Sequence, residues 1–186
     1  VVSVNGHTLE LDSPLPLPAN PTWKPTLMKV PHLQNCIVDG FQFEFIESKY
    51  PGHLKERGHN CISVSSTVES KIANITTTFA DSGIFLNNCG FVTIENVETH
   101  GRFMHHPISL SYSSHCLVKN FELNAPHIHG TTISWGSHFN VFVNGKGNAL
   151  AMDSHRACSF RNLHQNILIQ HGNVPKQPLR SGGSYN

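Results

Sequence analysis

The sequence predicts an all-β fold, a parallel β-helix (β-solenoid) with three short strands per coil and an asparagine ladder. The first observation is a set of asparagines that recur every 22–24 residues, each interrupting a short apolar strand pattern: Asn74, Asn96, Asn120, Asn144 and Asn166. The second is composition, because 14 glycines, 11 prolines and only 13% charged residues suit an all-β protein with many turns. A period in the twenties with one polar residue in register is typical of a solenoid.

Asparagine suits the bend between two strands for a physical reason. It tolerates the left-handed αL conformation, and its amide can bond the backbone of its own turn and the amide of the coil above. Because stacked coils lie about 4.8 Å apart, the five side chains are expected to form a buried ladder.

Each coil is predicted to contain a first strand, a turn, a second strand, the asparagine bend and a third strand. One coil reads Ile84-Phe85-Leu86, then the turn Asn87-Asn88-Cys89-Gly90, and then Thr93-Ile94-Glu95 before Asn96. Apolar and polar residues alternate within each strand, which indicates one face in the core and one face in solvent.

The coils are predicted to occupy residues 29–172. Residues 1–28 form an irregular, proline-rich N-terminal segment suited to capping the first coil, and residues 46–59 form a polar loop inserted between coils. Residues 173–186 are predicted to be a C-terminal tail without a capping element. Since an uncapped β-helix exposes unpaired strand edges, we expect either that this chain continues into a longer protein or that a second chain covers the last coil.

Composition also narrows the classes of function. A net charge of +1 with 13% charged residues argues against a nucleic-acid-binding protein, which would carry a basic stripe. No apolar run reaches the length of roughly 18 residues that a membrane-spanning helix needs, so no membrane partner is expected. Fourteen histidines in 186 residues is an unusually large number, and many of them lie between His100 and His164.

One candidate catalytic cluster follows from comparing equivalent positions of successive coils. Nine residues after the repeating asparagine come His105, His129 and Asp153, whereas the preceding coil has Gly83. These side chains are predicted to stack on adjacent coils about 5 Å apart, so that the aspartate can orient a histidine as a general base. A polar turn that only stabilises the coils is the alternative.

Neighbouring residues extend this cluster. Arg102 is the candidate for neutralising a substrate carboxylate or sulfate, and His106 and His155 are candidates for substrate binding. No cofactor is predicted with certainty. Two histidines and one aspartate are compatible with a divalent metal ion, calcium or zinc, but no short ligand motif supports one.

A second candidate cluster lies on the outward face of the third strand. Glu98 and Glu122 follow their asparagines by two residues, and Lys146 takes the same position one coil later. Two carboxylates one coil apart repel, so one should hold its proton as a general acid must. His100 and Asn124, four residues after their asparagines, are further substrate-binding candidates. A solvated β-face with cross-strand charge pairing is the alternative.

Aromatic residues supply candidates for stacking on a sugar ring. Trp135 is predicted at the exit of a first strand, and Tyr112 lies at the corresponding place one coil earlier. A tryptophan buried in the core is the alternative.

The asparagine ladder, the three-strand coil and the stacked apolar positions resemble the right-handed parallel β-helix proteins of the pectate-lyase-like superfamily. The resemblance covers roughly Leu27–Gly172, and three further stretches look like uncharacterised polysaccharide-active members: Asp153-Ser154-His155-Arg156, Asn162-Leu163 and Ser181-Gly182-Gly183. The resemblance implies an enzyme that cleaves acidic or sulfated polysaccharides by elimination or hydrolysis. It also implies a secreted, periplasmic or cell-surface location.

Three functions stay open. The chain could be a polysaccharide lyase with His105 or His129 as base, a glycoside hydrolase using Glu98 and Glu122, or a non-catalytic glycan-binding or structural β-helix. The unusual residues concentrate in the later coils while the earlier ones are bland, which favours an enzyme. A lyase is the preferred prediction, because histidine and arginine supply a base and a charge neutraliser without paired acids.

Overall fold

The computed structural model describes residues 2–11, 14–170 and 179–182, and the chain divides into two compact units. The smaller unit, Val1–Val30, holds the antiparallel strands β1 (Ser3–Asn5) and β2 (Thr8–Glu10) and the 3-10 helix η1 (Pro21–Trp23). Within the described part of the chain, no helix is long and apolar enough to cross a membrane.

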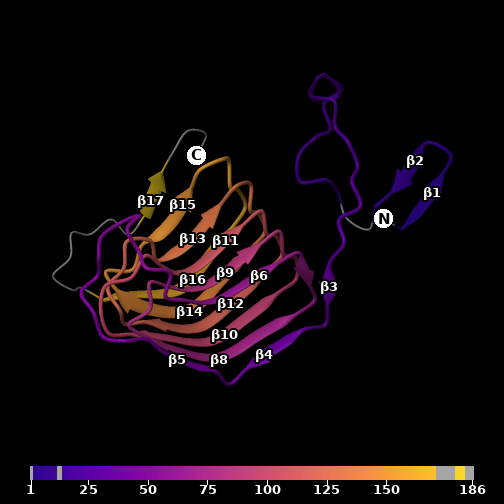
Figure 1. Cartoon of the computed structure of the whole chain (residues 1–186). Coiled ribbons are helices and arrows are strands. Elements are labelled where there is room, and N and C mark those ends of the chain that lie inside the picture. Colours follow the sequence, from indigo (N-terminus) through magenta and orange to yellow (C-terminus); the bar gives the residue numbers. More distant parts are fainter. Residues whose placement is uncertain (1, 12–13, 171–178, 183–186) are drawn as a thin grey trace. The chain divides into compact units, whose positions relative to one another are not determined.

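The larger unit, Pro31–Asn186, is a parallel β-solenoid of about five turns (Figure 1), which confirms the predicted fold class. One parallel sheet runs in the order β16-β14-β12-β10-β8-β4, and β5 also pairs with β8. Its strands are β4 (Ile37–Asp39), β5 (Gln42–Glu44), β8 (Lys71–Thr78), β10 (Thr93–His100), β12 (Leu117–Leu123), β14 (Val141–Asn148) and β16 (Leu163–Gln170).

The second parallel sheet runs in the order β17-β15-β13-β11-β9-β6. Its strands are β6 (Asn60–Ser65), β9 (Ser82–Asn87), β11 (His106–Ser111), β13 (Thr131–Ser134), β15 (Met152–His155) and β17 (Leu179–Gly182). The turns between the two sheets carry the short pair β3 (Leu33–Gln34) and β7 (Thr67–Val68), and then single bridges from coil to coil.

The C-terminal part of the solenoid differs from the sequence prediction. Residues 173–186 are predicted to be a tail, but β17 pairs in parallel with β15 and so adds a further strand to the second sheet. The remaining residues of that predicted tail, 173–178 and 183–186, lie outside the described residues.

The five repeating asparagines lie at the bends that divide the long strands, between the predicted second and third strands. All five have φ between 52° and 56°, the αL conformation predicted for them. Their side chains are exposed, however, so the prediction of a buried ladder is wrong. Four side-chain amides donate to the preceding coil: Asn74 to Asp39 (2.7 Å), Asn96 to Asn74 (2.8 Å), Asn120 to Asn96 (3.4 Å) and Asn166 to Asn144 (2.7 Å).

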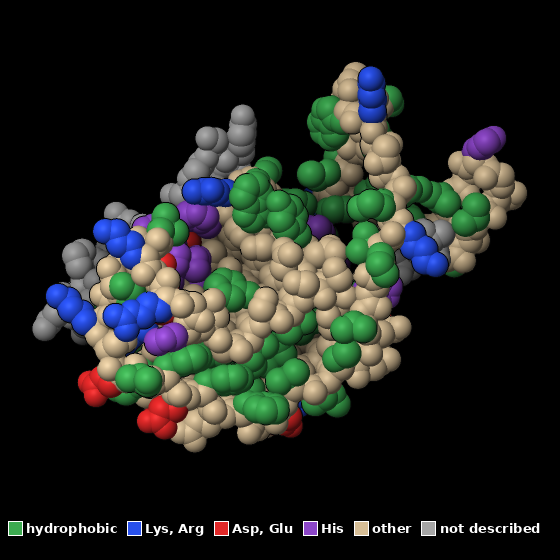
Figure 2. Space-filling view, in the orientation of Figure 1, with side chains coloured by type: hydrophobic (Ala, Val, Ile, Leu, Met, Phe, Trp, Pro, Cys, Tyr) green, Lys and Arg blue, Asp and Glu red, His purple; other side chains and the backbone are tan. Residues whose placement is uncertain are grey.

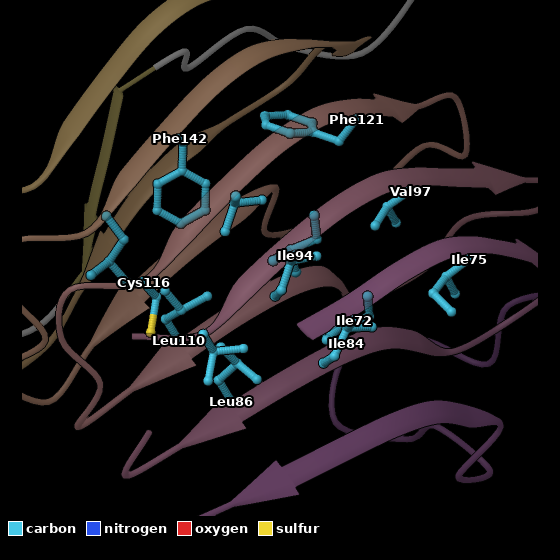
Figure 3. Close-up of a cluster of buried hydrophobic side chains, with 14 of the residues drawn as sticks. Ile72, Ile75, Ile84, Leu86, Ile94, Val97, Leu110, Cys116, Phe121 and Phe142 are labelled. Atoms are coloured by element: carbon cyan, nitrogen blue, oxygen red, sulfur yellow. The ribbon is translucent and has the colours of Figure 1, made fainter. Parts of the chain in front are cut away.

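The hydrophobic core fills the space between the two sheets. Ile84, Leu86 and Leu110 of the second sheet pack in one cluster with Ile94 and Phe142 of the first (Figure 3), and all five are essentially inaccessible to solvent. Burying each such side chain stabilises the fold by roughly 1.5–3 kcal/mol, so this cluster fixes which face of each strand points outward.

One glycine in the first sheet is required by this packing. Gly145 pairs with Phe121 of the neighbouring coil, and a Cβ built at Gly145 would lie 2.0 Å from the Phe121 ring. The large ring on one coil therefore occupies the space left by the missing side chain on the next.

A buried polar stack stabilises the turns that lead into the first sheet. Asn140 is fully buried; its Oδ1 accepts from the backbone N–H of Cys116, and its Nδ2 donates to the Ser113 carbonyl oxygen and to Asn162 Oδ1. Ser137 adds a hydroxyl that accepts from the backbone N–H of Ser113. This stack, rather than the exposed asparagine column, satisfies buried backbone groups between coils.

Candidate functional site

Five histidines gather at the edge of the second sheet, and we call them the histidine cluster. His53 comes from the inserted loop, His105 from just before β11, His106 from its first position, His129 from just before β13, and His155 from the end of β15. Neighbouring ring centroids are 4.1–5.1 Å apart along the path His53, His105, His106, His129 and His155. Figure 2 shows histidine side chains (purple) close together over the C-terminal strands, beside basic side chains (blue).

The most deeply buried member of the cluster is paired with a carboxylate. His129 Nδ1 lies 2.6 Å from Asp153 Oδ2, and the two side chains are 5% and 0% exposed. Because a carboxylate accepts, Nδ1 carries a proton, and in the tautomer that this contact selects Nε2 keeps its lone pair. Asp153 Oδ1 is buried without a hydrogen-bond partner. The pair is therefore a tautomer-fixed imidazole beside a carboxylate of which one oxygen is unsatisfied.

A second histidine is held in the same way by the inserted loop. His105 Nδ1 lies 3.1 Å from Glu56 Oε1, and the Tyr50 hydroxyl donates a short hydrogen bond to the same carboxylate oxygen. Burial lowers the pKa of His105 to about 4; Glu56 opposes this shift and the neighbouring histidines reinforce it. At neutral pH His105 is thus a neutral ring that donates Nδ1–H to Glu56, and its Nε2 is available as an acceptor.

His106 lies deeper in the cluster than its neighbour. Its ring stacks on His129 with an interplanar angle of 11°, and its Nδ1 lies 3.0 Å from Thr132 Oγ1. Burial lowers the pKa of His106 to about 2, so this ring is also neutral.

The inserted loop is anchored by a buried ion pair. Asp81 Oδ2 accepts from the backbone N–H groups of Arg57 and His59, and Asp81 Oδ1 accepts from Arg102 at 2.7 Å. Burial pushes the pKa of Asp81 up, but these hydrogen bonds and the Arg102 charge outweigh it and hold the pKa below its usual value. The Arg102 side chain is 9% exposed and does not line the groove described next, so the structure gives it a structural place instead of the predicted contact with substrate.

The histidine cluster lines a groove of about 340 Å³ on the outer face of the second sheet, and we call it the histidine groove. Its floor carries the hydroxyl groups of Ser109, Ser111, Thr132 and Ser134 on neighbouring strands, together with Phe85, which pairs with Ser109. Arg156 lines the groove after the end of β15 and supplies the positive charge that the sequence assigned to Arg102.

Trp135 lines the histidine groove as predicted, and it does not lie in the core. Its ring stacks on Tyr112 of the preceding coil with centroids 5.7 Å apart and an interplanar angle of 19°. The two side chains are 42% and 57% exposed, so they offer a nearly flat aromatic surface to solvent.

The backbone register of the cluster differs from the prediction at one position. His129 N–H donates to the His105 carbonyl oxygen at 3.0 Å, which places these two residues on neighbouring coils as predicted. Asp153, however, pairs with Thr132 and not with His129. The side chains of His129 and Asp153 meet all the same, because the imidazole reaches across the difference in register.

The second predicted cluster lies in a separate groove on the first sheet. Glu98 and Glu122 occupy paired positions of β10 and β12 and line this groove with Lys146. Each carboxylate already has a partner: His100 lies 3.1 Å from Glu98, and Lys146 lies 2.7 Å from Glu122. Asn124 sits apart from that groove, where its carbonyl oxygen accepts from Asn148. The two glutamates are about half exposed, so they form a solvated charge pattern rather than a desolvated acid pair.

The sequence prediction lacks two residues that line the histidine groove, His53 and Arg156, and it lacks Glu56, which pairs with His105. His53 and Glu56 come from the inserted loop, whose residues have no place in the coil period. Arg156 follows the predicted Asp153 and His155 directly, and the short spacing of acid, histidine and arginine is a signal that could have identified it.

Comparison with known proteins identifies no family. No family model matches the sequence, and no curated protein matches it. One solved structure with a similar arrangement is described as the DFA-IIIase from Arthrobacter chlorophenolicus A6 in complex with DFA-III, at 9% sequence identity and a TM-score of 0.31. The match covers 82% of this chain and 58% of that protein, and a TM-score this low carries no argument about this chain.

Proposed function

We propose that this chain is a carbohydrate-active enzyme that binds a polysaccharide in the histidine groove and cleaves an acidic or sulfated chain by β-elimination. The observation that carries the proposal is the combination, in one groove, of the tautomer-fixed His129 with Arg156 and Trp135. A proton acceptor, a cation and an exposed aromatic surface are the three groups that this reaction needs.

Sugar binding is supported by the surface of the groove. The stacked rings of Tyr112 and Trp135 form a flat apolar surface on which the apolar face of a sugar ring can pack. Their hydroxyl and indole N–H groups can also form hydrogen bonds. The serine and threonine hydroxyls of the floor can both donate to and accept from sugar hydroxyls.

The chemistry follows from the tautomer of His129. Its Nε2 accepts the proton on the carbon next to the substrate carboxylate, the released electron pair forms a carbon–carbon double bond, and the glycosidic carbon–oxygen bond breaks. The departing oxygen takes a proton from solvent. Arg156 stabilises the charge that develops on the carboxylate, and Asp153 stabilises the positive charge that His129 acquires.

The glycoside hydrolase alternative finds less support. Glu98 and Glu122 are exposed and paired with cations, and they lie in a groove that shares no lining residue with the histidine groove. Neither is therefore placed in the apolar surroundings that keep a catalytic carboxylic acid protonated.

The test is an assay of the purified chain on a panel of uronic-acid and sulfated polysaccharides, read as ultraviolet absorbance of new unsaturated ends. His129→Ala should reduce turnover on the best substrate roughly a hundredfold, because a general base contributes at least that much. His115→Asn is the matched control; it changes an exposed histidine outside the groove and keeps a residue that tolerates its φ of 57°.

Two results would count against the proposal. One is near-native turnover of a His129→Ala variant whose circular dichroism spectrum is unchanged. The other is the appearance of reducing ends without unsaturation, abolished by Glu122→Gln, which would move the chemistry to the second groove.

A further inference from the structure

We propose that His53, His105 and His129 together bind one divalent transition-metal ion, with Zn²⁺ as the first candidate. One nitrogen atom from each of these three side chains can be chosen so that all three lie within 4.8 Å of one another. The three come from different parts of the chain, the inserted loop and two successive coils, so only the folded solenoid brings them together.

The orientation of two of the rings is that of metal ligands. His105 and His129 each have Nδ1 engaged by a carboxylate, Glu56 and Asp153, at 3.1 Å and 2.6 Å. Histidines that bind metals nearly always donate their other N–H to a carboxylate, a carbonyl or water, which fixes the tautomer and makes the free nitrogen a better ligand. Both rings therefore leave Nε2 with its lone pair available.

Charge balance gives an independent argument. Asp153 is fully buried and its Oδ1 has no hydrogen-bond partner, which is a costly state for a carboxylate. Glu56, the second carboxylate beside the cluster, is 14% exposed as a side chain. A doubly charged cation held by the neutral rings between them would balance these two negative charges.

The distances suit closure around an ion by a small movement. Zinc binds imidazole nitrogen at about 2.0–2.1 Å in a tetrahedral site, so the nitrogens of bound ligands lie about 3.4 Å apart. Since His53 is exposed and lies on a loop, it is the ligand that can move to close the site. Three nitrogen ligands leave the fourth position open towards the histidine groove, as in catalytic rather than structural zinc sites.

A second set of three residues, His129, Asp153 and His155, also comes within 4.8 Å, but it is the weaker candidate. His129 Nδ1 and Asp153 Oδ2 are 2.6 Å apart, which is a hydrogen-bond distance and too short for two ligands of one tetrahedral ion. Calcium does not suit either set, because calcium takes six to eight oxygen ligands and the cluster offers mainly imidazole nitrogen.

This inference does not depend on the polysaccharide or on the elimination reaction. An ion on His129 Nε2 would make that residue a ligand and pass the task of accepting a proton to solvent bound at the open position. The experiment therefore reads ion binding directly, so that its failure leaves the proposed function standing and the failure of the lyase assay leaves the metal site standing.

The test is titration of the chelator-treated chain with Zn²⁺ by calorimetry, together with the visible absorption of added Co²⁺. We expect one ion per chain and the absorption of a four-coordinate cobalt site. His53→Ala and His105→Ala should each weaken binding at least a hundredfold, and Glu56→Gln should weaken it roughly tenfold to a hundredfold with all three ligands intact. His53 lies on an exposed loop, so His53→Ala tests the site without threatening the fold.

His115→Asn is again the matched control and should bind like the unchanged chain. Absence of stoichiometric Zn²⁺ binding would overturn the proposal, and so would full binding by His53→Ala. Loss of binding in His155→Ala with full binding in His53→Ala would assign the ion to the second set of residues and overturn the ligand assignment made here.

Discussion

Two asparagine positions in this solenoid have different physical roles. Asn120 sits at an exposed bend, where φ is 54° and its amide donates one hydrogen bond of 3.4 Å to Asn96. Asn140 has no solvent exposure, and its side chain accepts from the Cys116 N–H and donates to the Ser113 carbonyl oxygen, two backbone groups of the preceding coil. Asparagine is favoured at position 120 because it tolerates a positive φ, and at position 140 because its amide pairs buried backbone groups.

This difference predicts contrasting costs of substitution. Asn140→Ala should lower the free energy of unfolding by about 2–3 kcal/mol or more, because buried backbone donors and acceptors lose their partners. Asn120→Gly should change it by less than about 1 kcal/mol, because glycine adopts the same φ and an exposed hydrogen bond contributes little. Urea denaturation of both variants tests this, and equal losses would contradict it.

Gly145 gives a second prediction at this scale. In Gly145→Ala the new methyl group would collide with the Phe121 ring, so we expect a loss of about 1–3 kcal/mol from overpacking. Phe121→Leu added to Gly145→Ala should recover part of this loss in thermal melts, because a smaller side chain leaves room for the methyl group. If the double variant is no more stable than the sum of the two single changes predicts, the collision is not the cause.

Among the elements, the inserted loop of residues 46–59 matters most for the site. It contributes His53 to the histidine cluster and Glu56 as the partner of His105, and its return to the solenoid is fixed where Asp81 accepts the backbone N–H groups of Arg57 and His59. Asp81, which is itself paired with Arg102, therefore anchors the end of the loop to the solenoid.

Releasing that anchor should free the loop while the coils remain folded. In Asp81→Asn the Arg102 guanidinium loses its charge partner in a buried place, so we expect destabilisation of about 3 kcal/mol and faster trypsin cleavage after Lys49 or Lys55. Cleavage sites read by mass spectrometry test this. Glu95→Gln, which removes an ion-pair partner of Lys71 and Lys119 on the other sheet, is the control and should leave the loop as resistant as before.

The element order could be predicted from the sequence, and the loop geometry could not. The period of the asparagines is set by the coil, so the strands and bends follow from it. Ser109, Thr132 and Asp153 pair with one another in the sheet, but they follow the repeating asparagine of their coil by 13, 12 and 9 residues. Comparing positions at a constant offset of nine residues therefore matches Asp153 with the wrong residue. His53 and Glu56 were missed for the same reason, since a loop outside the period has no register to compare.

Across the whole solenoid, buried neutral histidines make stability depend on pH. His164 stacks on Phe142 and lies 3.1 Å from Thr131 Oγ1, and burial lowers its pKa to about 4. Burial also lowers the pKa values of His105, His106 and His127. The folded state therefore favours the uncharged form of each of these rings in the later coils.

The sign of the effect follows from the lowered pKa values. The unfolded chain binds the proton near pH 6.5 and the folded chain only near pH 4, so stability is complete above about 6.5 and is lost as the pH falls towards 4. For His164 alone the loss should be about 3 kcal/mol. Urea denaturation at neutral and mildly acidic pH should show a smaller dependence for His164→Phe than for the unchanged chain, and an equal dependence would contradict the assignment.

The register of the parallel strands has a further consequence, for folding rather than for chemistry. From β8 and β6 onward, the described strands of the two sheets pair with strands one coil away, which lie about two dozen residues distant in the chain, and β4 and β5 pair with β8 across the inserted loop. Since these described pairings join coils that are adjacent in the chain, folding can begin at a well-packed coil and spread in both directions along the solenoid. The same arrangement means that mechanical force applied at one end should peel the solenoid coil by coil rather than break it in a single event.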